Sequence, residues 1–212
     1  MIKFQNESTV IVMRKIEKIL TLAEDNNGLI KTSKIVKMGI RKELLRTLVD
    51  RDQLVKVKRG VYKLSADSID DYEIIQMMEP KAIFSYDSAL YLLKLSDRIP
   101  EKIHMTVCYD ANVSMTKKKY PELVFHYVKP DFYSLGKIEI QTAFGAKICS
   151  YNAERTVLDI IKDRGKMDTQ IFTDALKMYF NSNNKNILQL GKYAKKMGLE
   201  SKLRIYTEVM LE

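Results

Sequence analysis

The sequence predicts an α+β fold in two domains, and three observations carry this prediction. Residues 8–64 change from helical to strand periodicity over a short distance. Residues 103–150 contain short runs of β-branched and apolar residues that are typical of strands, among them residues 103–108 and 123–128, with a loop expected at residues 117–119. Residues 153–211 have helical periodicity almost throughout, with Asn152 expected to cap the first of these helices and Gly198 to end the third. We therefore expect a small first domain at residues 1–66 and a mixed α+β domain at residues 67–212 that ends in several helices.

A pair of short helices is expected in the first domain, after one longer helix. The pair covers residues 32–38 and 40–52, and Gly39 separates its two members. Thr32 or Ser33 is expected to cap the first member through its hydroxyl group. In the second member, apolar residues recur at the spacing of one helical face and basic residues lie on the other side.

A basic strand hairpin follows the two helices. Val55 and Val57 alternate with lysines, which is the period-two pattern of a strand. Arg59 and Gly60 form the expected turn, and residues 61–64 supply the return strand. Helix, turn, helix and hairpin is the element order of a winged helix-turn-helix, with Arg59 at the tip of the wing.

The net positive charge of the chain is concentrated in this first domain. The whole chain carries +9, and residues 1–66 hold 15 Lys and Arg against 7 Asp and Glu, a net of +8. Cationic side chains bind a phosphate backbone by displacing its condensed counterions. Charge and motif together favour double-stranded DNA as the partner, over a basic surface that serves only solubility. Residues 115–212, with 17 basic and 11 acidic side chains, could add a second basic surface.

The expected DNA contacts come from three places. The second helix of the pair presents Arg and Lys, which suit guanine O6 and N7, and Thr, which can meet a thymine methyl group. The start of the first helix offers hydroxyl and backbone N–H groups to phosphate, and the wing can reach the backbone or the minor groove. The candidate DNA-binding residues are Thr32, Ser33, Lys34, Arg41, Lys42, Arg46, Thr47, Lys58 and Arg59, with Glu43 as a further candidate.

Three motifs stand in order along the chain. They are RGVYKL at residues 59–64, AIFSYDSAL at 82–90 followed by LSDRIP at 95–100, and YNAERTVLD at 151–159. The ordered set resembles the AbiEi antitoxins of type IV (AbiE) toxin–antitoxin systems, which act in abortive phage infection. One departure is Arg41, where the family often has serine or threonine at the start of the recognition helix.

This resemblance implies a bacterial antitoxin that also represses its own operon. The first domain would bind inverted repeats in promoter DNA, and the second domain would carry the antitoxin activity. The counterpart in such pairs is a nucleotidyltransferase-like toxin, and the resemblance does not imply that the two proteins touch.

Three other functions are alternatives to the antitoxin. A generic winged-helix regulator would resemble the AbiEi antitoxins in its first domain alone. A metal-dependent nucleic-acid enzyme would need carboxylates such as Asp131 and Glu139, but Gln141 stands where that chemistry wants a lysine. An adaptor that binds a protein partner through its second domain is a third possibility. Metal-dependent turnover would identify the enzyme, and a stable complex on gel filtration would identify the adaptor.

We expect no enzyme activity, no cofactor and no metal. The sequence has no Walker loop and no dinucleotide-binding glycine pattern. His104 and Cys108 lie four residues apart on one expected strand, about 13 Å by strand rise, which is too far to share a metal ion.

We also expect a cytoplasmic protein with no membrane partner. No apolar run approaches the roughly 20 residues of a membrane span, no signal peptide is recognisable, and Cys108 and Cys149 are expected to be buried free thiols.

Overall fold

The fold is mixed α+β and is built from two compact units, Met1–Met78 and Glu79–Glu212. The boundary expected between residues 66 and 67 lies outside the part of the chain that the structure describes. The computed structural model describes residues 7–26, 28–65 and 70–210.

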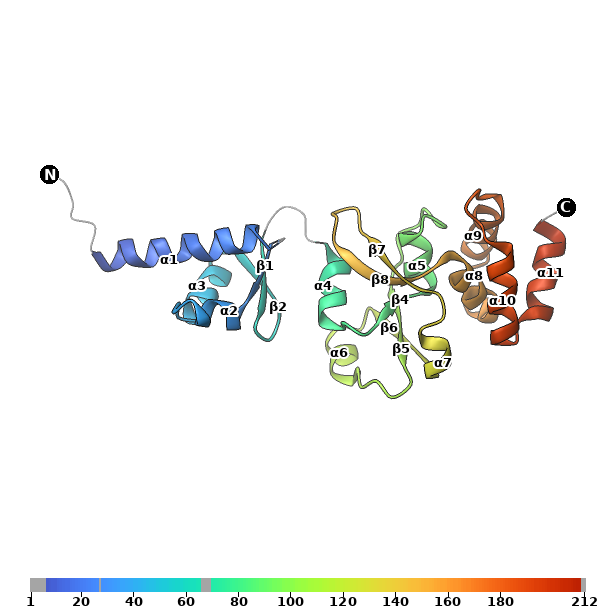
Figure 1. The fold of residues 1–212 in the computed structure, drawn as a ribbon, viewed down its shortest axis with the longest axis horizontal. Helices are drawn as coiled ribbons and strands as arrows, with labels where there is room; N and C mark the ends of the chain where they lie inside the picture. Colours follow the sequence, from blue (N-terminus) through green and yellow to red (C-terminus); the bar gives the residue numbers. More distant parts are fainter. Residues whose placement is uncertain (1–6, 27, 66–69, 211–212) are drawn as a thin grey trace. The chain divides into compact units, whose positions relative to one another are not determined.

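The first unit combines four helices and three short strands in its described part (Figure 1). In chain order they are α1 (Glu7–Glu24), β1 (Leu29–Lys31), α2 (Thr32–Lys37), α3 (Glu43–Asp50), β2 (Leu54–Lys58), β3 (Val61–Leu64) and α4 (Asp71–Met78). From α1 to β3 this is the element order of a winged helix-turn-helix.

A small antiparallel sheet and three helices enclose one core. The strands lie in the order β1-β3-β2, with Leu29 opposite Lys63 and Leu54 opposite Leu64. The apolar faces of α1, α2 and α3 pack on one another and on this sheet, because their buried residues recur at helical spacing. The core residues are Ile19, Ala23, Ile30, Ile35, Ile40, Leu45, Leu48 and Leu54.

The start of α2 differs from the sequence prediction. The helix begins at Thr32, its N-cap residue is Lys31, and no side chain caps it. The backbone N–H of Thr32 instead donates to the carbonyl oxygen of Gly60 at 2.8 Å. The expected cap by Thr32 or Ser33 is therefore wrong, because the wing turn, which is distant in sequence, supplies the acceptor.

Helix α3 is shorter than the expected span of residues 40–52. Ile40 is buried ahead of the helix, where its N–H donates to the carbonyl oxygen of Ile35 at 3.1 Å. At the other end Asp52 has a positive φ of 56°, which stops the helix. Burial of Ile40 in the turn and the left-handed Asp52 thus shorten the helix at both ends.

Helix α4 belongs to the first unit, so the compact unit extends to Met78. Lys63 of β3 donates to Glu73 of α4 at 2.5 Å, and both side chains are nearly buried. Lys58 of β2 donates to the carbonyl oxygen of Met77 at 2.5 Å. These bonds attach α4 to the wing strands, which the charge pattern of the sequence did not indicate.

The second unit contains a five-stranded sheet and a group of helices. In chain order its elements are β4 (Ile83–Phe84), α5 (Tyr86–Leu92), β5 (Ile103–Cys108), α6 (Ser114–Lys119), β6 (Leu123–Val128), α7 (Pro130–Tyr133), β7 (Lys137–Gln141), β8 (Lys147–Tyr151), α8 (Ala153–Lys162), a 3-10 turn (Arg164–Lys166), α9 (Thr169–Asn181), α10 (Ile187–Met197) and α11 (Glu200–Met210). The short helix α6 corrects the expectation of a loop at residues 117–119.

The sheet has the strand order β6-β5-β4-β8-β7. Strands β5 and β6 run parallel, as do β4 and β8, while the β4–β5 and β7–β8 pairs are antiparallel. A parallel pair needs a crossover connection, and the segment containing α6 provides it between β5 and β6. The strands predicted at residues 103–108 and 123–128 match β5 and β6.

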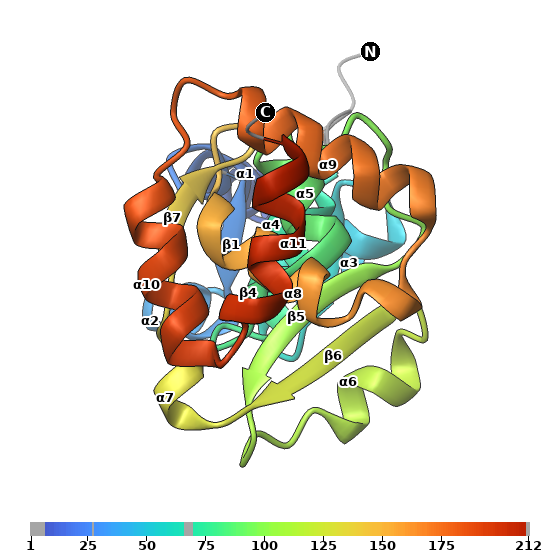
Figure 2. The same ribbon diagram turned by 90° about the vertical axis from the view of Figure 1, so that its right-hand side faces the viewer.

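Helix α8 is the centre of the helical group, with α9, α10 and α11 around it (Figure 2). Eight consecutive residues from Glu154 to Ile161 are buried in it. Its expected cap is confirmed, since Asn152 accepts a hydrogen bond from the backbone N–H of Arg155 at 3.0 Å. The expected end of α10 at Gly198, which has a φ of 66°, is also confirmed.

Two further observations concern the chain as a whole. Cys108 and Cys149 are not joined in a disulfide bond, and both are half-buried. Among the described residues, none of the helices combines the length and the apolar character that crossing a membrane requires.

Candidate nucleic-acid interface

The wing is tied directly to the helix pair. The Thr32–Gly60 hydrogen bond holds the hairpin turn against the start of α2. Gly60 has a φ of 77°, a conformation that favours glycine in a tight turn. A Cβ atom at this position would lie 3.7 Å from the Thr32 hydroxyl oxygen, so the two segments approach closely. The structure thus brings together the start of α2 and the wing tip, as the candidate interface requires.

Helix α3 presents a cationic face to solvent. Leu45 and Leu48 are fully buried on its inner side, whereas Lys42 and Arg46 are exposed on the outer side. Arg46 forms no ion pair within the described part of the chain. The guanidinium group of Arg46 is therefore exposed on the outer side of α3 without an ion-pair partner in the described part of the chain.

Two other candidates near α3 have local partners. Thr47 is half-buried, and its hydroxyl donates to the carbonyl oxygen of Glu43 at 3.4 Å, so its contact with a base is restricted. Arg41 lies in the turn before the helix, and its Nε is 3.7 Å from Oε2 of Glu43. Both side chains of this pair are mostly exposed, so the pair is weak and Arg41 can exchange it for a phosphate.

The candidates on α2 lie at its first turn. Ser33 and Lys34 are exposed, and Thr32 is half-buried. The ammonium group of Lys34 donates to the Asn26 side-chain oxygen at 3.3 Å. Lys37 is also exposed, one helical turn after Lys34, and the sequence reading missed it. The three-residue spacing from Lys34 is the signal that could have identified it.

The two wing candidates differ in their environment. Arg59 is exposed at the hairpin turn. Lys58 is half-buried, and its hydrogen bond to the Met77 carbonyl directs its ammonium group to α4. Arg59 is therefore the exposed cation of the wing, and Lys58 attaches the wing to α4.

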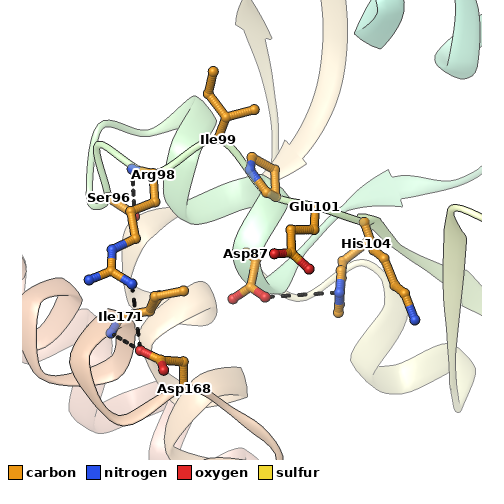
Figure 3. Close-up of a pocket in the computed structure, with 10 residues that line it drawn as sticks. Asp87, Ser96, Arg98, Ile99, Glu101, His104, Asp168 and Ile171 are labelled. Atoms are coloured by element: carbon orange, nitrogen blue, oxygen red, sulfur yellow. Dashed lines mark hydrogen bonds and ion pairs between the residues drawn. The ribbon is translucent and has the colours of Figure 1, made fainter.

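The second unit contains a polar pocket that the sequence reading did not anticipate (Figure 3). The cavity has a volume of about 360 Å³, and Asp87, Arg98, His104 and Asp168 are among the residues that line it. Oδ2 of Asp87 lies 3.9 Å from Nε2 of His104. Oδ1 of Asp87 is buried and has no hydrogen-bond partner among the described residues.

A second histidine, His126, contacts His104 of this pocket. Nδ1 of His104 is 3.0 Å from Nε2 of His126, and the Tyr86 ring stacks on His126 with ring centroids 3.9 Å apart. Burial lowers the pKa of both histidines, that of His126 to about 4, and raises the pKa of Asp87. Both rings are neutral at neutral pH, so one donates to the other. The two histidines are 22 residues apart in sequence, and the parallel β5–β6 register brings them to one face.

The carboxylates considered for a metal-dependent enzyme lie elsewhere. Asp131 is on α7, and Glu139 is an exposed residue of β7 whose carboxylate is 3.2 Å from the Lys147 ammonium group. Glu139 is thus an outward residue of an alternating strand. No set of three His, Cys, Asp or Glu side chains is arranged to hold a metal ion in the described part of the chain.

Comparisons with known proteins give two similarities. Residues 17–64 match the family model described as "Transcriptional regulator, AbiEi antitoxin", and this match ends with strand β3. The fold is similar to the crystal structure of the RV2827C protein from Mycobacterium tuberculosis, with a TM-score of 0.64, 12% identity, and coverage of 87% of this chain and 71% of that one. At this identity the likeness concerns the fold. No curated protein sequence matches the chain.

Proposed function

We propose that this chain is a DNA-binding transcriptional regulator and the antitoxin of a toxin–antitoxin pair. The observation that carries the proposal is the exposed cationic face of α3, with the Arg59 wing tied to the neighbouring helix by the Thr32–Gly60 bond. This arrangement lies within residues 17–64, the segment that matches the AbiEi antitoxin regulators.

The finer parts of the proposal follow from the ordered motifs. The chain would act in a type IV system in the cytoplasm, bind inverted repeats in its own promoter, and oppose a nucleotidyltransferase-like toxin. Base contacts are assigned to Lys42 and Arg46, and phosphate contacts to Ser33, Arg41 and Arg59. The distinction rests on position, because α3 residues can reach base edges while wing and turn residues meet the backbone.

Promoter binding tests the regulatory part. Arg46→Ala should weaken operator binding by about 1–3 kcal/mol and relax sequence preference. Arg59→Ala should weaken specific and random DNA alike and reduce the salt slope by about one. Mobility-shift titrations at several salt concentrations measure both effects. Arg14→Ala, which removes an exposed arginine of α1, is the matched control and should leave affinity within about two-fold. Equal affinity of the unchanged chain for its upstream region and for random DNA would refute specific repression.

Co-expression tests the antitoxin part separately. The chain and an Arg46→Ala/Arg59→Ala variant are each induced with the neighbouring toxin gene from a promoter that neither protein controls. Rescue of growth by both proteins supports an antitoxin activity that lies in the second unit. Failure of the unchanged chain to rescue growth would refute the antitoxin proposal and leave a regulator.

A further inference from the structure

We infer that the second unit binds the phosphate group of a small phosphorylated ligand in a basic pocket beside α8. The pocket has a volume of about 240 Å³. Three cations line it: Lys129, which follows β6, and Arg155 and Lys162, which belong to α8. Tyr127, Phe132 and Met197 supply its other walls. The pocket is separate from the candidate DNA-binding residues, all of which belong to the first unit.

The positive charge of the residues that line the pocket indicates that its ligand is an anion. None of the residues that line it is acidic. Lys129 and Lys162 are exposed, and neither forms an ion pair in the part of the chain that the structure describes. Lys202 adds a further cation nearby, since its Nζ lies 3.5 Å from the carbonyl oxygen of Lys162. Several cations around one concave site raise the local concentration of anions.

Arg155 supplies a fixed donor at this site. It is only 1% exposed, and its Nε lies 3.0 and 3.1 Å from the two Asp159 carboxylate oxygens. Its Nη1 donates to the carbonyl oxygens of Phe132 and Leu135, and its guanidinium carbon is 4.2 Å from the centre of the Tyr151 ring. Nη2 donates to no acceptor among the described residues. A guanidinium held on so many sides loses little entropy when it binds a further oxyanion, and phosphate suits its geometry.

The place and size of the pocket define the ligand further. It lies beyond the carboxyl end of β6, which runs parallel to β5, and such strand ends are common ligand sites. Its volume is below the roughly 300–1,000 Å³ of pockets that enclose a drug-sized molecule. It therefore holds one phosphate group and the adjoining atoms. The half-exposed ring of Tyr127 offers a surface on which a base or sugar of the ligand can pack outside the pocket.

Calorimetric titration of the full chain tests the inference, with inorganic phosphate, AMP and adenosine as probes. We expect phosphate and AMP to bind and adenosine not to bind. Lys129→Ala/Lys162→Ala, which changes two exposed side chains and should not affect folding, should weaken AMP binding by about ten-fold or more. Lys137→Ala removes an exposed lysine of β7 and is the matched control, with a change below about two-fold.

Four results would overturn the inference, and the first three come from the titration. They are no heat with phosphate or AMP at millimolar concentration, equal affinity of the double variant, and binding of adenosine as tight as that of AMP. Promoter affinity of the double variant is measured in parallel. A loss there as large as the loss of AMP binding would assign these lysines to the DNA footprint instead and refute a small-ligand site. Failure of promoter binding by the unchanged chain bears on the proposed function alone.

Discussion

In the first unit Arg41 pairs with Glu43 on the surface, whereas in the second unit Arg155 pairs with Asp159 in the interior. The side chains of the surface pair are 83% and 60% exposed, and those of the interior pair are 1% and 4% exposed. A surface pair contributes at most about 1 kcal/mol and exchanges readily with other partners. A buried pair cannot lose one member without leaving a charge in a medium of low polarity.

This difference indicates a division of tasks between the units. The first unit leaves Lys42, Arg46 and Arg59 exposed, where they can meet an external phosphate backbone. The second unit uses most donors of Arg155 internally to join α8 to the segment before β7. Exposed cations without a fixed partner thus characterise α3 and the wing of the first unit, whereas the Arg155–Asp159 pair of the second unit serves the architecture.

The largest predicted effect is at the buried pair. Arg155→Met should lower the free energy of unfolding of the second unit by about 3–5 kcal/mol, because Asp159 loses its counterion. Burial raises the pKa of Asp159 to about 6, so most of this carboxyl remains charged at pH 7 beside Arg155. Hydrogen exchange of the α8 amides measures the loss. Arg41→Met, the surface counterpart, should change stability by less than about 0.5 kcal/mol. Similar small effects of both substitutions would remove the proposed difference between the units.

Local patterns predicted the elements well, but not the contacts between them. The limits of β5 and β6 and the caps at Asn152 and Gly198 follow from neighbours within a few residues in sequence. The Thr32–Gly60 bond joins residues 28 positions apart, so a cap by the Thr32 hydroxyl was the wrong expectation.

For the same reason, two contacts at the candidate sites were not predicted. The hydrogen bond from Lys58 to the Met77 carbonyl was not predicted, because the position of α4 cannot be read from the wing sequence. The contact between His104 and His126 depends on the parallel register of two strands, which periodicity does not specify. Exposed Arg46 and Arg59, by contrast, follow from helical phase and turn position alone.

The second predicted effect concerns this histidine pair and the dependence of stability on pH. An unfolded chain protonates His126 near pH 6.5, whereas burial and neighbouring His104 lower its pKa in the folded chain to about 4. Between these values the unfolded state binds more protons, so stability falls as the pH falls from 6.5 to 4. The contribution of His126 to this loss should be about 1–3 kcal/mol.

His126→Gln tests this contribution, because glutamine retains a polar partner for His104 and does not titrate. Urea unfolding at pH 7 and pH 4.5 should give a smaller stability difference for the variant than for the unchanged chain. Equal differences would show that the pair is not the source of acid sensitivity. The test extends the comparison of the units, since the first unit contains no histidine and should show no such step.

The smallest predicted effect concerns the Lys63–Glu73 pair, which lies in the first unit but is mostly buried, like the Arg155–Asp159 pair of the second. Its side chains are 11% and 13% exposed, and the Nζ–Oε2 distance is 2.5 Å. Glu73→Gln should destabilise the first unit by about 1–2 kcal/mol, because the Lys63 ammonium group keeps a hydrogen bond but loses its counterion. Hydrogen exchange of the α4 and β3 amides measures this loss. Glu43→Gln, at the exposed pair, is the control and should change exchange by less than about 0.5 kcal/mol. Faster exchange in α4 without a change in β3 would mean that α4 opens independently of the wing, and the compact unit would then end before α4.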